Sequence, residues 1–322
     1  MEQVKKLIFN IFLLLAIKSY SNEAQRPLAA PFISGDDFRS FCKFMFDAPK
    51  PAINKSFNFA NVIAFNPAEV RDGDTIFVNL FYLEPFFKFF HPRIKSKYIL
   101  ITHNGDDAVD EKFLKYLDDP QLAFWFTQNC QVKHERVIQI PIGLSLRCLT
   151  NNIHIHENVL KLQHSIKNIH PKKERLLYAN IRTYTNPQER APLEQHLSKL
   201  NFCSVAGQKG FTDYLIDLAY SKFTVSPAGK GPDCHRTWEA MYVACIPIVK
   251  KSIMDPLYED LPVLIVDKWE DITEKFLEKK YKEMTKKQYN FNKLYIKYWF
   301  NLIQKYQQKV KDAALLEFLT LG

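Results

Sequence analysis

A chain of 322 residues with 47% hydrophobic and 14% aromatic side chains can build two packed domains, which excludes a largely disordered protein. The formal net charge of +9 favours an anionic partner, but no zinc-finger spacing or RNA-binding aromatic motif accompanies it, so we expect no nucleic acid. Many of the lysines fall in the last fifty residues or so, where EKKYKEMTKKQYN indicates first a solvated helix face and second a contact with an anionic surface.

The N-terminal residues have the layout of a secretory signal peptide. Lys5 and Lys6 precede the apolar run LIFNIFLLLAI, and the small or polar residues KSYSN follow it. The run is too short to span a bilayer comfortably, so residues 1–21 are expected to be a signal peptide, with an uncleaved anchor or a buried first helix as alternatives. The expected location is the lumen of the secretory pathway, the periplasm or the outside of the cell. No membrane span is expected apart from this leader.

Helical and extended patterns alternate along the first half of the chain. The turn residues Asp72–Asp74 precede the apolar run TIFVNL, and Pro92 and Pro120 each end a helical segment. The buried pattern of KYILITHNGDD breaks into a polar loop. We expect helices over residues 36–47, 81–94 and 110–120, and strands within 71–80, 97–107, 122–130 and 137–144.

The alternation restarts after a polar helix and linker at residues 151–174. Expected strands lie within 175–181, 202–207, 222–227, 245–251 and 262–267, and expected helices within 185–200, 210–221, 234–244 and 271–308.

Strands that alternate with helices predict parallel sheets with helices on their faces. We therefore expect an α/β protein with two tandem Rossmann-like domains, one over residues 22–170 and one over residues 171–322 that includes the closing helices. The seam is expected near Pro171, and no sequence repeat relates the halves. Ligands of open parallel sheets bind beyond the carboxyl ends of the strands, so the cleft between the domains is the expected site.

One strand, loop and helix in the second domain has the chemistry of an anion site. In FTVSPAGKGPDCHRTWEAMYVACIPIV, Gly229 and Gly231 leave room for a ligand to approach the loop backbone, and Asp233 is the expected N-cap. The helix N-terminus offers unpaired N–H groups, and Arg236 adds a fork-shaped cation that suits phosphate. Glu239 lies three residues on, on the same face, where a carboxylate can accept two ribose hydroxyls.

These groups together predict recognition of a nucleoside diphosphate, although neither G-x-x-x-x-G-K-[ST] nor G-x-G-x-x-G is present. The alternative is an exposed Arg236–Glu239 pair on a purely structural helix.

The segment SPAGKGPDCHRTWEAMYVACIPIVKKSIMDPLYEDLPVLIVDKWEDI resembles the C-terminal domain of the exostosin family of glycosyltransferases. That family shows a P-x-G loop, an R-x-x-E-A helix and a G-C-I-P-V-I strand. Two departures are Ala244, where the family has glycine, and a loop that carries Lys230, a further candidate phosphate contact. The matching residues here are Pro227, Gly229, Arg236, Glu239, Ala240, Cys245, Ile246 and Pro247.

The resemblance is specific over about fifty residues and looser elsewhere. It implies a GT-B-type architecture, an inverting mechanism, and a nucleotide-sugar donor held by the C-terminal domain. By the same resemblance, Arg236 would neutralise the diphosphate and Glu239 would hold the ribose. The usual donor base of the family is uracil.

Inverting transfer needs a base for the acceptor hydroxyl and cations for the leaving diphosphate. The loop LITHNGDD supplies our base candidates, Asp106 and Asp107, with His103 as a third, and the alternative is a loop merely capped by aspartates. We expect Arg182, rather than Asn180 or Arg190, to reach the diphosphate from the second domain's first strand-helix junction.

No metal or other cofactor is expected, because the motifs that would bind one are weak. The D-x-D triplet at Asp72 and Asp74 precedes a strand, where D-G-D is a normal tight turn and not a metal site. His154 and His156 alternate in an extended segment, which is more typical of a half-exposed strand than of a metal site. None of the six cysteines forms a CxxC, and Cys203 and Cys245 are expected to be buried thiols.

These observations favour an inverting glycosyltransferase that moves a sugar from a nucleotide-sugar donor, UDP-linked by the family's habit, to a glycan or other hydroxyl acceptor. The first alternative is a non-catalytic glycan- or nucleotide-binding protein on the same fold. The second is a non-sugar enzyme on doubly wound domains, which is weakened by the missing G-x-G-x-x-G and by the lack of a serine or cysteine nucleophile motif.

Overall fold

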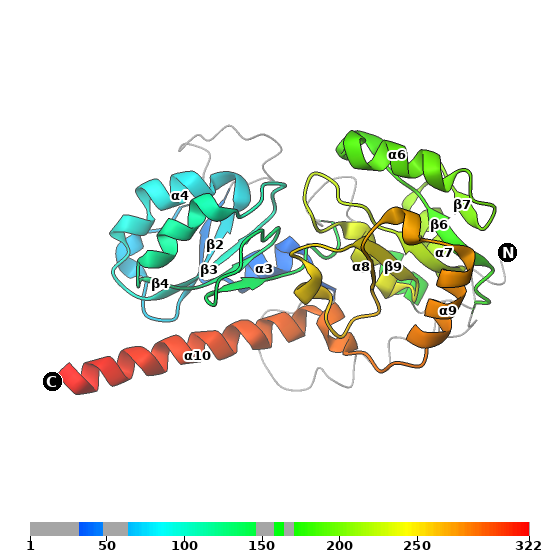
Figure 1. Cartoon of the computed structure of the whole chain (residues 1–322). Helices are drawn as coiled ribbons and strands as arrows, with labels where there is room; N and C mark the ends of the chain where they lie inside the picture. Colours follow the sequence, from blue (N-terminus) through cyan, green and yellow to red (C-terminus); the bar gives the residue numbers. More distant parts are fainter. Residues whose placement is uncertain (1–31, 48–63, 146–157, 164–170, 322) are drawn as a thin grey trace. The chain divides into compact units, whose positions relative to one another are not determined.

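The computed structural model describes residues 32–47, 64–145, 158–163 and 171–321. These residues form two compact α/β units (Figure 1). The N-terminal unit comprises the described residues of 33–142 and 295–321, and the C-terminal unit comprises Phe32 and the described residues of 143–294. The expected signal peptide, together with Cys148, His154 and His156, lies outside the described residues.

The N-terminal unit is built on a five-stranded, fully parallel sheet in which spatial order follows chain order. Right-handed crossovers that always step in the same direction place every connecting segment on one face of a sheet. The strands are β1 (Phe44–Phe46), β2 (Thr75–Asn79), β3 (Tyr98–His103), β4 (Leu122–Thr127) and β5 (Val137–Gln139).

The connecting face of this sheet holds a dense aromatic core under helix α4 (Leu83–Phe89). Phe86, Phe87 and Trp125 are fully buried there, and Phe87 and Trp125 meet edge to face with ring centroids 5.5 Å apart. Aromatic pairs of this kind stabilise a core beyond the area they bury.

Helices α3 (Gly35–Phe41) and α10 (Ile296–Leu321) cover the opposite face (Figure 1). Phe300 of α10 stacks on Phe41 with centroids 4.4 Å apart, and Tyr306 meets Phe124 of β4 at 4.6 Å. The expectation that all closing helices belong to the C-terminal domain was therefore wrong for α10. The N-terminal sheet needs this helix because its own crossovers leave one apolar face bare.

The expected helix over residues 36–47 also ends early. Its last residues form β1, because Phe44–Phe46 pair in register with Ile76–Val78 of β2 and bury Phe46 completely. Local helical periodicity is overridden here by the sheet edge that β2 offers.

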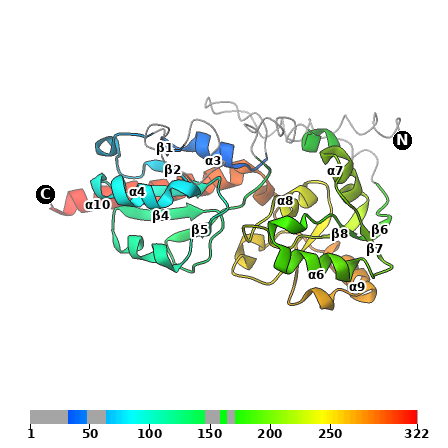
Figure 2. The same cartoon turned by 90° about the horizontal axis from the view of Figure 1, so that it is seen from above.

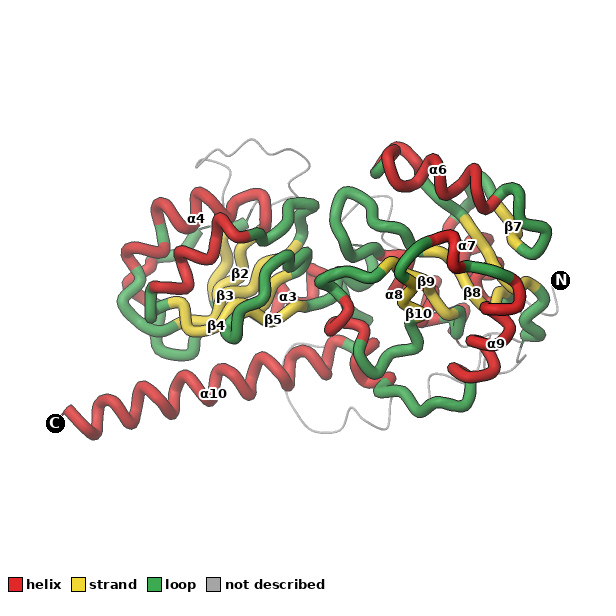
Figure 3. Tube along the Cα trace, in the orientation of Figure 1, coloured by secondary structure: helices red, strands yellow, loops and turns green. Residues whose placement is uncertain are grey.

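The C-terminal unit holds a second five-stranded parallel sheet, in the order β10-β9-β8-β6-β7. Strands β7, β8, β9 and β10 are labelled in Figure 3. The chain steps from β6 outward to β7, returns past β6 to β8, and continues to β9 and β10. This is a doubly wound sheet whose direction reverses between β6 and β8. The strands are β6 (Arg175–Ala179), β7 (Cys203–Val205), β8 (Ser221–Val225), β9 (Ile246–Lys250) and β10 (Leu264–Val266).

The reversal places helices on both faces, as Figure 2 shows. Helices α6 (Pro187–Leu197) and α9 (Glu274–Met284) share one apolar cluster against the sheet, and α7 (Phe211–Ala219) packs beside α8 (His235–Tyr242) on the other face. Residues 158–163 are helical and belong to this unit, where Gln163 donates from Nε2 to the Tyr242 carbonyl at 2.9 Å. The boundary of the units therefore precedes the expected seam at Pro171.

Short segments of 3-10 helix complete the connections. They lie at Pro67–Glu69, Leu80–Tyr82, His91–Arg93, Glu111–Asp118, Thr183–Thr185, Asp255–Tyr258, Trp269–Asp271 and Phe291–Leu294.

The two tandem parallel α/β units confirm the expected fold class, and they are the architecture that a GT-B-type protein requires. The cleft expected between them stays a prediction. Within the described part of the chain, no helix is long and apolar enough to cross a membrane. Cys245 is a buried free thiol as expected, whereas Cys203 is free but only half-buried. Burial raises the pKa of both thiols to about 12.

Candidate functional site

The loop after β8 is held in place by one buried arginine, Arg190 of α6, which is 5% exposed. Its guanidinium donates from Nη2 to the Pro227 carbonyl at 2.8 Å, from Nε to the Ala228 carbonyl at 2.9 Å, and from Nη1 to the Arg182 carbonyl at 3.1 Å. Arg190 thus joins the loops that follow β6 and β8. In the sequence Arg190 was a less favoured candidate than Arg182 for a diphosphate contact, whereas its hydrogen bonds make it a support for the loop.

Gly229 is required by this arginine. A Cβ at Gly229 would lie 3.0 Å from Nη2 of Arg190, which has no freedom to move because its other donors are engaged. The Gly229 N–H donates to the Gly231 carbonyl at 3.0 Å, which closes the tip of the loop. Lys230 lies at that tip and is exposed. The first glycine therefore serves the approach of Arg190 rather than the room for a ligand that its position had suggested.

Helix α8 begins one residue later than expected, with Cys234 as its N-cap and no side-chain capping bond. The expected N-cap, Asp233, is instead buried and accepts hydrogen bonds from Trp238 Nε1 at 2.9 and 3.0 Å and from the Tyr258 hydroxyl at 3.0 Å. Cys234, the N-cap residue, makes no side-chain hydrogen bond to the backbone N–H groups of the first turn of α8. These first-turn donors are the ones that bind anions at helix N-termini.

Arg236 and Glu239 share a face of α8 but do not pair with each other. Arg236 donates from Nη2 to the Asn180 carbonyl, and its Nε is buried without a hydrogen-bond partner among the described residues. Glu239 is 8% exposed and accepts the Tyr214 hydroxyl on Oε2 at 3.0 Å. No carboxylate in the described part of the chain lies within 4.0 Å of the Arg236 guanidinium. The exposed ion pair of the alternative reading is therefore absent among the described residues.

The bond from Arg236 to Asn180 marks the position of the site in the sheet. Asn180 directly follows β6, and α8 follows the loop after β8. These two neighbouring strands are the ones between which the chain reverses direction, and ligands of doubly wound sheets bind at that point, outside the carboxyl ends of the strands. Arg182 lies at the same edge with an exposed side chain and a carbonyl fixed by Arg190.

Burial and the charges around α8 shift the pKa values of a neighbouring hydroxyl and a neighbouring thiol. Burial raises the pKa of Tyr214 well above 10, and the carboxylate of Glu239 raises it further, while Arg236 opposes both. Burial also raises the pKa of the Cys234 thiol, against the lowering effect of Arg190 and Arg236. Both groups therefore lie within reach of the positive charge of Arg236.

The loop after β3 places the three candidate bases differently. His103 is 1% exposed, accepts the Asn104 N–H on Nδ1 at 2.8 Å, and donates from Nε2 to the Pro141 carbonyl at 3.0 Å. Both ring nitrogens are used internally, which makes this histidine a support of the loop. Asp106 is exposed and Asp107 is half-buried at the loop surface.

Two side-chain amides that follow β4 hold this loop in place through hydrogen bonds. Gln128 Nε2 and Asn129 Nδ2 both donate to the Gly105 carbonyl, at 3.0 and 3.2 Å. A Cβ at Gly105 would lie 2.6 Å from that of Leu80, so only glycine fits there. The available signal in the sequence was the polar run that directly follows the buried strand, Gln128 and Asn129.

The D-x-D triplet forms the expected turn before β2. Asp74 donates its N–H to the Arg71 carbonyl at 3.0 Å, Gly73 has φ +80°, and Asp72 Oδ1 accepts the Lys97 N–H at 2.7 Å. Across the described ranges, no group of three or more histidine, cysteine or acidic side chains could hold a metal ion.

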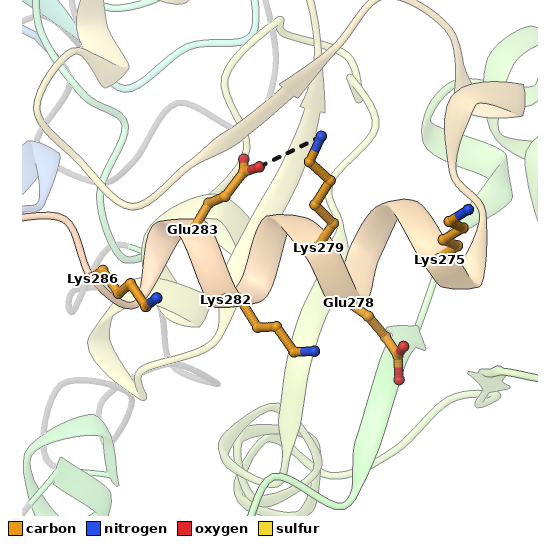
Figure 4. A pocket seen from close by; sticks show the side chains of 6 residues that line it. All are labelled: Lys275, Glu278, Lys279, Lys282, Glu283 and Lys286. Carbon is orange, nitrogen blue, oxygen red and sulfur yellow. Dashed lines mark ion pairs between the residues drawn. The ribbon is translucent and has the colours of Figure 1, made fainter.

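Two hollows lie elsewhere on the C-terminal unit. The first, about 390 Å³, is formed by side chains of α9 and the turn after it, where Lys279 meets Glu283 at 3.9 Å (Figure 4). All of its charged groups belong to one outward helix face, in agreement with the predicted solvated lysine run. The second, about 460 Å³, is lined by Asn186, Gln188, Glu189, Pro192, Leu193, His196, Lys250, Trp269 and Glu270.

No protein-family model and no curated protein matches this chain. Among solved structures it is similar to the crystal structure of an alpha1,3-fucosyltransferase, with 12% identity, a TM-score of 0.45, and coverage of 76% of this chain and 79% of that one. It is also similar to the UDP-GlcNAc 2-epimerase of Methanocaldococcus jannaschii, with 10% identity, a TM-score of 0.32, and coverage of 68% and 72%. Neither likeness locates a site or an activity in this chain.

Proposed function

We propose that this protein is a glycosyltransferase whose C-terminal unit holds the nucleoside diphosphate of a nucleotide-sugar donor at the N-terminus of α8. The observation that carries the proposal is the arrangement of Arg236 and Glu239, which lie at the reversal point of the sheet and have no charged partner there. The resemblance of residues 226–272 to the exostosin family supports the same assignment.

A half-buried guanidinium without a carboxylate destabilises the folded protein, because no counter-ion offsets the free energy lost when the charge is desolvated. A bound diphosphate would offset this loss by accepting charge-assisted hydrogen bonds from Arg236. It would also accept hydrogen bonds from the backbone N–H groups in the first turn of α8. Arg236 and these groups would stabilise the diphosphate most as it leaves, when its negative charge grows. Lys230 at the loop tip and Arg182 after β6 are the further cations proposed for this anion.

Transfer would proceed as one in-line displacement with inversion at the anomeric carbon. The acceptor oxygen forms its bond to that carbon while the bond from carbon to the diphosphate oxygen breaks, and the electron pair leaves with the diphosphate. Asp106 or Asp107 would take the proton of the acceptor hydroxyl as general base. The acceptor is proposed to be a glycan or another hydroxyl compound, and the donor to be UDP-linked, as in the exostosin family.

A thermal-shift screen of UDP, GDP and ADP, each with and without an attached sugar, tests the proposal. A ligand that binds the folded state at a hundred times its Kd adds about 2.7 kcal/mol of stability, so at least one nucleoside diphosphate should raise the Tm clearly. Inorganic sulfate at the same ionic strength controls for general anion effects. No shift with any of the nucleotides would reject the proposal. Binding without transfer or hydrolysis of any donor would favour the non-catalytic binding protein.

A further inference from the structure

Tyr214 is the only described side chain that hydrogen-bonds the carboxylate of Glu239. It comes from α7, is 8% exposed, and donates its hydroxyl to Oε2 of Glu239 at 3.0 Å. The neighbouring helices α7 and α8 pack on the same face of the sheet, so this bond joins two elements and not two turns of one helix. One carboxylate oxygen is therefore committed inside the protein, and the other is not bonded by any described residue.

We propose that Tyr214 is a positioning residue that aims the second oxygen of Glu239 at the ribose of the donor, and so makes the site selective for ribonucleotides over deoxyribonucleotides. This inference rests on the proposed function. Tyr214 does not itself touch the ligand in this scheme. It restricts Glu239 to one side-chain conformation and leaves a single, oriented acceptor for a ribose hydroxyl.

The surroundings of the pair support this role. A carboxylate as buried as that of Glu239 needs hydrogen bonds to offset the loss of its hydration, and the tyrosine supplies one. Burial and the Glu239 charge keep the pKa of Tyr214 well above 10, so its hydroxyl stays protonated and remains a donor at neutral pH. Without the hydroxyl, Glu239 could turn toward Arg236 or toward solvent, and its orientation toward a ribose would be lost.

The same layer contains a matched control. Tyr178 of β6 is also buried and donates its hydroxyl to a carboxylate, Asp217 Oδ2, at 3.0 Å. Asp217 is also bonded by Lys209 and lies 3.3 Å from Arg175, so the carboxylate of this second pair belongs to a charged network that does not include Glu239. Tyr178→Phe removes a buried tyrosine hydroxyl that donates to a carboxylate, and it leaves the bond between Tyr214 and Glu239 in place.

The experiment compares the Kd of UDP with that of 2′-deoxy-UDP, and of GDP with 2′-deoxy-GDP, by calorimetry. The unaltered protein should prefer the ribonucleotide by about tenfold, as expected for one hydrogen bond to a charged group. Tyr214→Phe should reduce that preference to about twofold or less, while Tyr178→Phe should keep it. Glu239→Gln should lose the preference as well, and adding Tyr214→Phe to it should change nothing more, because the tyrosine acts through the glutamate.

The outcomes separate this inference from the function on which it rests. If the unaltered protein binds no nucleoside diphosphate, both the proposed function and this inference are rejected. If it binds them but Tyr214→Phe retains the preference, or Tyr178→Phe loses it equally, only the role of Tyr214 is overturned. If the Tyr214→Phe variant does not fold, the Glu239→Gln variant is used instead. An unchanged preference of that variant for the ribonucleotide rules the inference out. A lost preference supports the contact between Glu239 and the ribose, through which Tyr214 acts.

Discussion

Arg236 and Glu239 lie three residues apart on α8, a spacing at which opposite charges usually pair on a helix surface. Each instead bonds a neutral group from another element, Asn180 in one case and Tyr214 in the other. The sequence predicted that both would share a helix face, but it left open whether they would pair, because that depends on what β6 and α7 bring beside them. The unpaired arrangement is what an anion and a sugar diol would require.

Asp106 and Asp107 are the two carboxylates whose loss should stop catalysis. We expect one of the single variants Asp106→Asn and Asp107→Asn, and the double variant, to lower sugar transfer by about 10²- to 10⁴-fold, which is the usual contribution of a general base. Nucleotide affinity should stay unchanged, because neither side chain belongs to the donor loop. Asp118→Asn, an exposed change at the other end of the same unit's sheet, is the control. Full transfer activity in the double variant would remove both residues from the mechanism.

His103 shows the limit of reading such a loop from sequence. Its position at the end of β3 suggested a base, yet both ring nitrogens bond the loop itself and Pro141. A histidine at a strand end looks the same in the sequence whether it faces a ligand or supports the loop. The difference comes from Pro141, which lies 38 residues away in the chain.

At the scale of elements, the strand–loop–helix unit from β8 to α8 was predictable, whereas its anchoring was not. The buried run, the loop glycines and the amphipathic helix are local patterns, and the structure places them as expected. Arg190 comes from α6 and donates to the carbonyls of Pro227 and Ala228, which lie 37 and 38 residues further along the chain. A local sequence pattern cannot indicate contacts over such a separation. In the same way, β1 was missed because Phe44–Phe46 gain their extended form only by pairing with β2.

Arg190 should matter for the integrity of the loop as much as for the stability of the unit. Arg190→Met keeps the aliphatic stem and removes the donors, so the carbonyls of Pro227, Ala228 and Arg182 lose their bonds. We expect a loss of about 3 kcal/mol in the free energy of unfolding, measured by urea titration. Arg182→Met, at an exposed side chain, should change it by no more than about 0.5 kcal/mol. Equal effects of the two substitutions would contradict the anchoring role.

For the whole molecule, the strands of the N-terminal sheet come first in the chain, the strands of the C-terminal sheet follow, and α10 returns to the N-terminal unit. The hydrophobic pattern of α10 predicts a helix, but it does not say which sheet the helix covers. The consecutive strand order of the N-terminal sheet supplies the reason, because it leaves one face without crossover helices. Phe300 and Tyr306 fill that face, while Leu316 and Phe318 near the end of the helix remain exposed.

The central claim is that Arg236 forms the anion site of a nucleotide-sugar enzyme. Calorimetric titration of UDP, GDP and ADP into the protein and into Arg236→Gln tests it most directly, with Lys282→Gln on the solvated face of α9 as the charge-matched control. We predict that at least one nucleotide binds the unaltered and the control protein alike, and that Arg236→Gln weakens this binding at least tenfold, about 1.4 kcal/mol or more. Equal affinity in all three proteins, or no binding in any, would contradict the account.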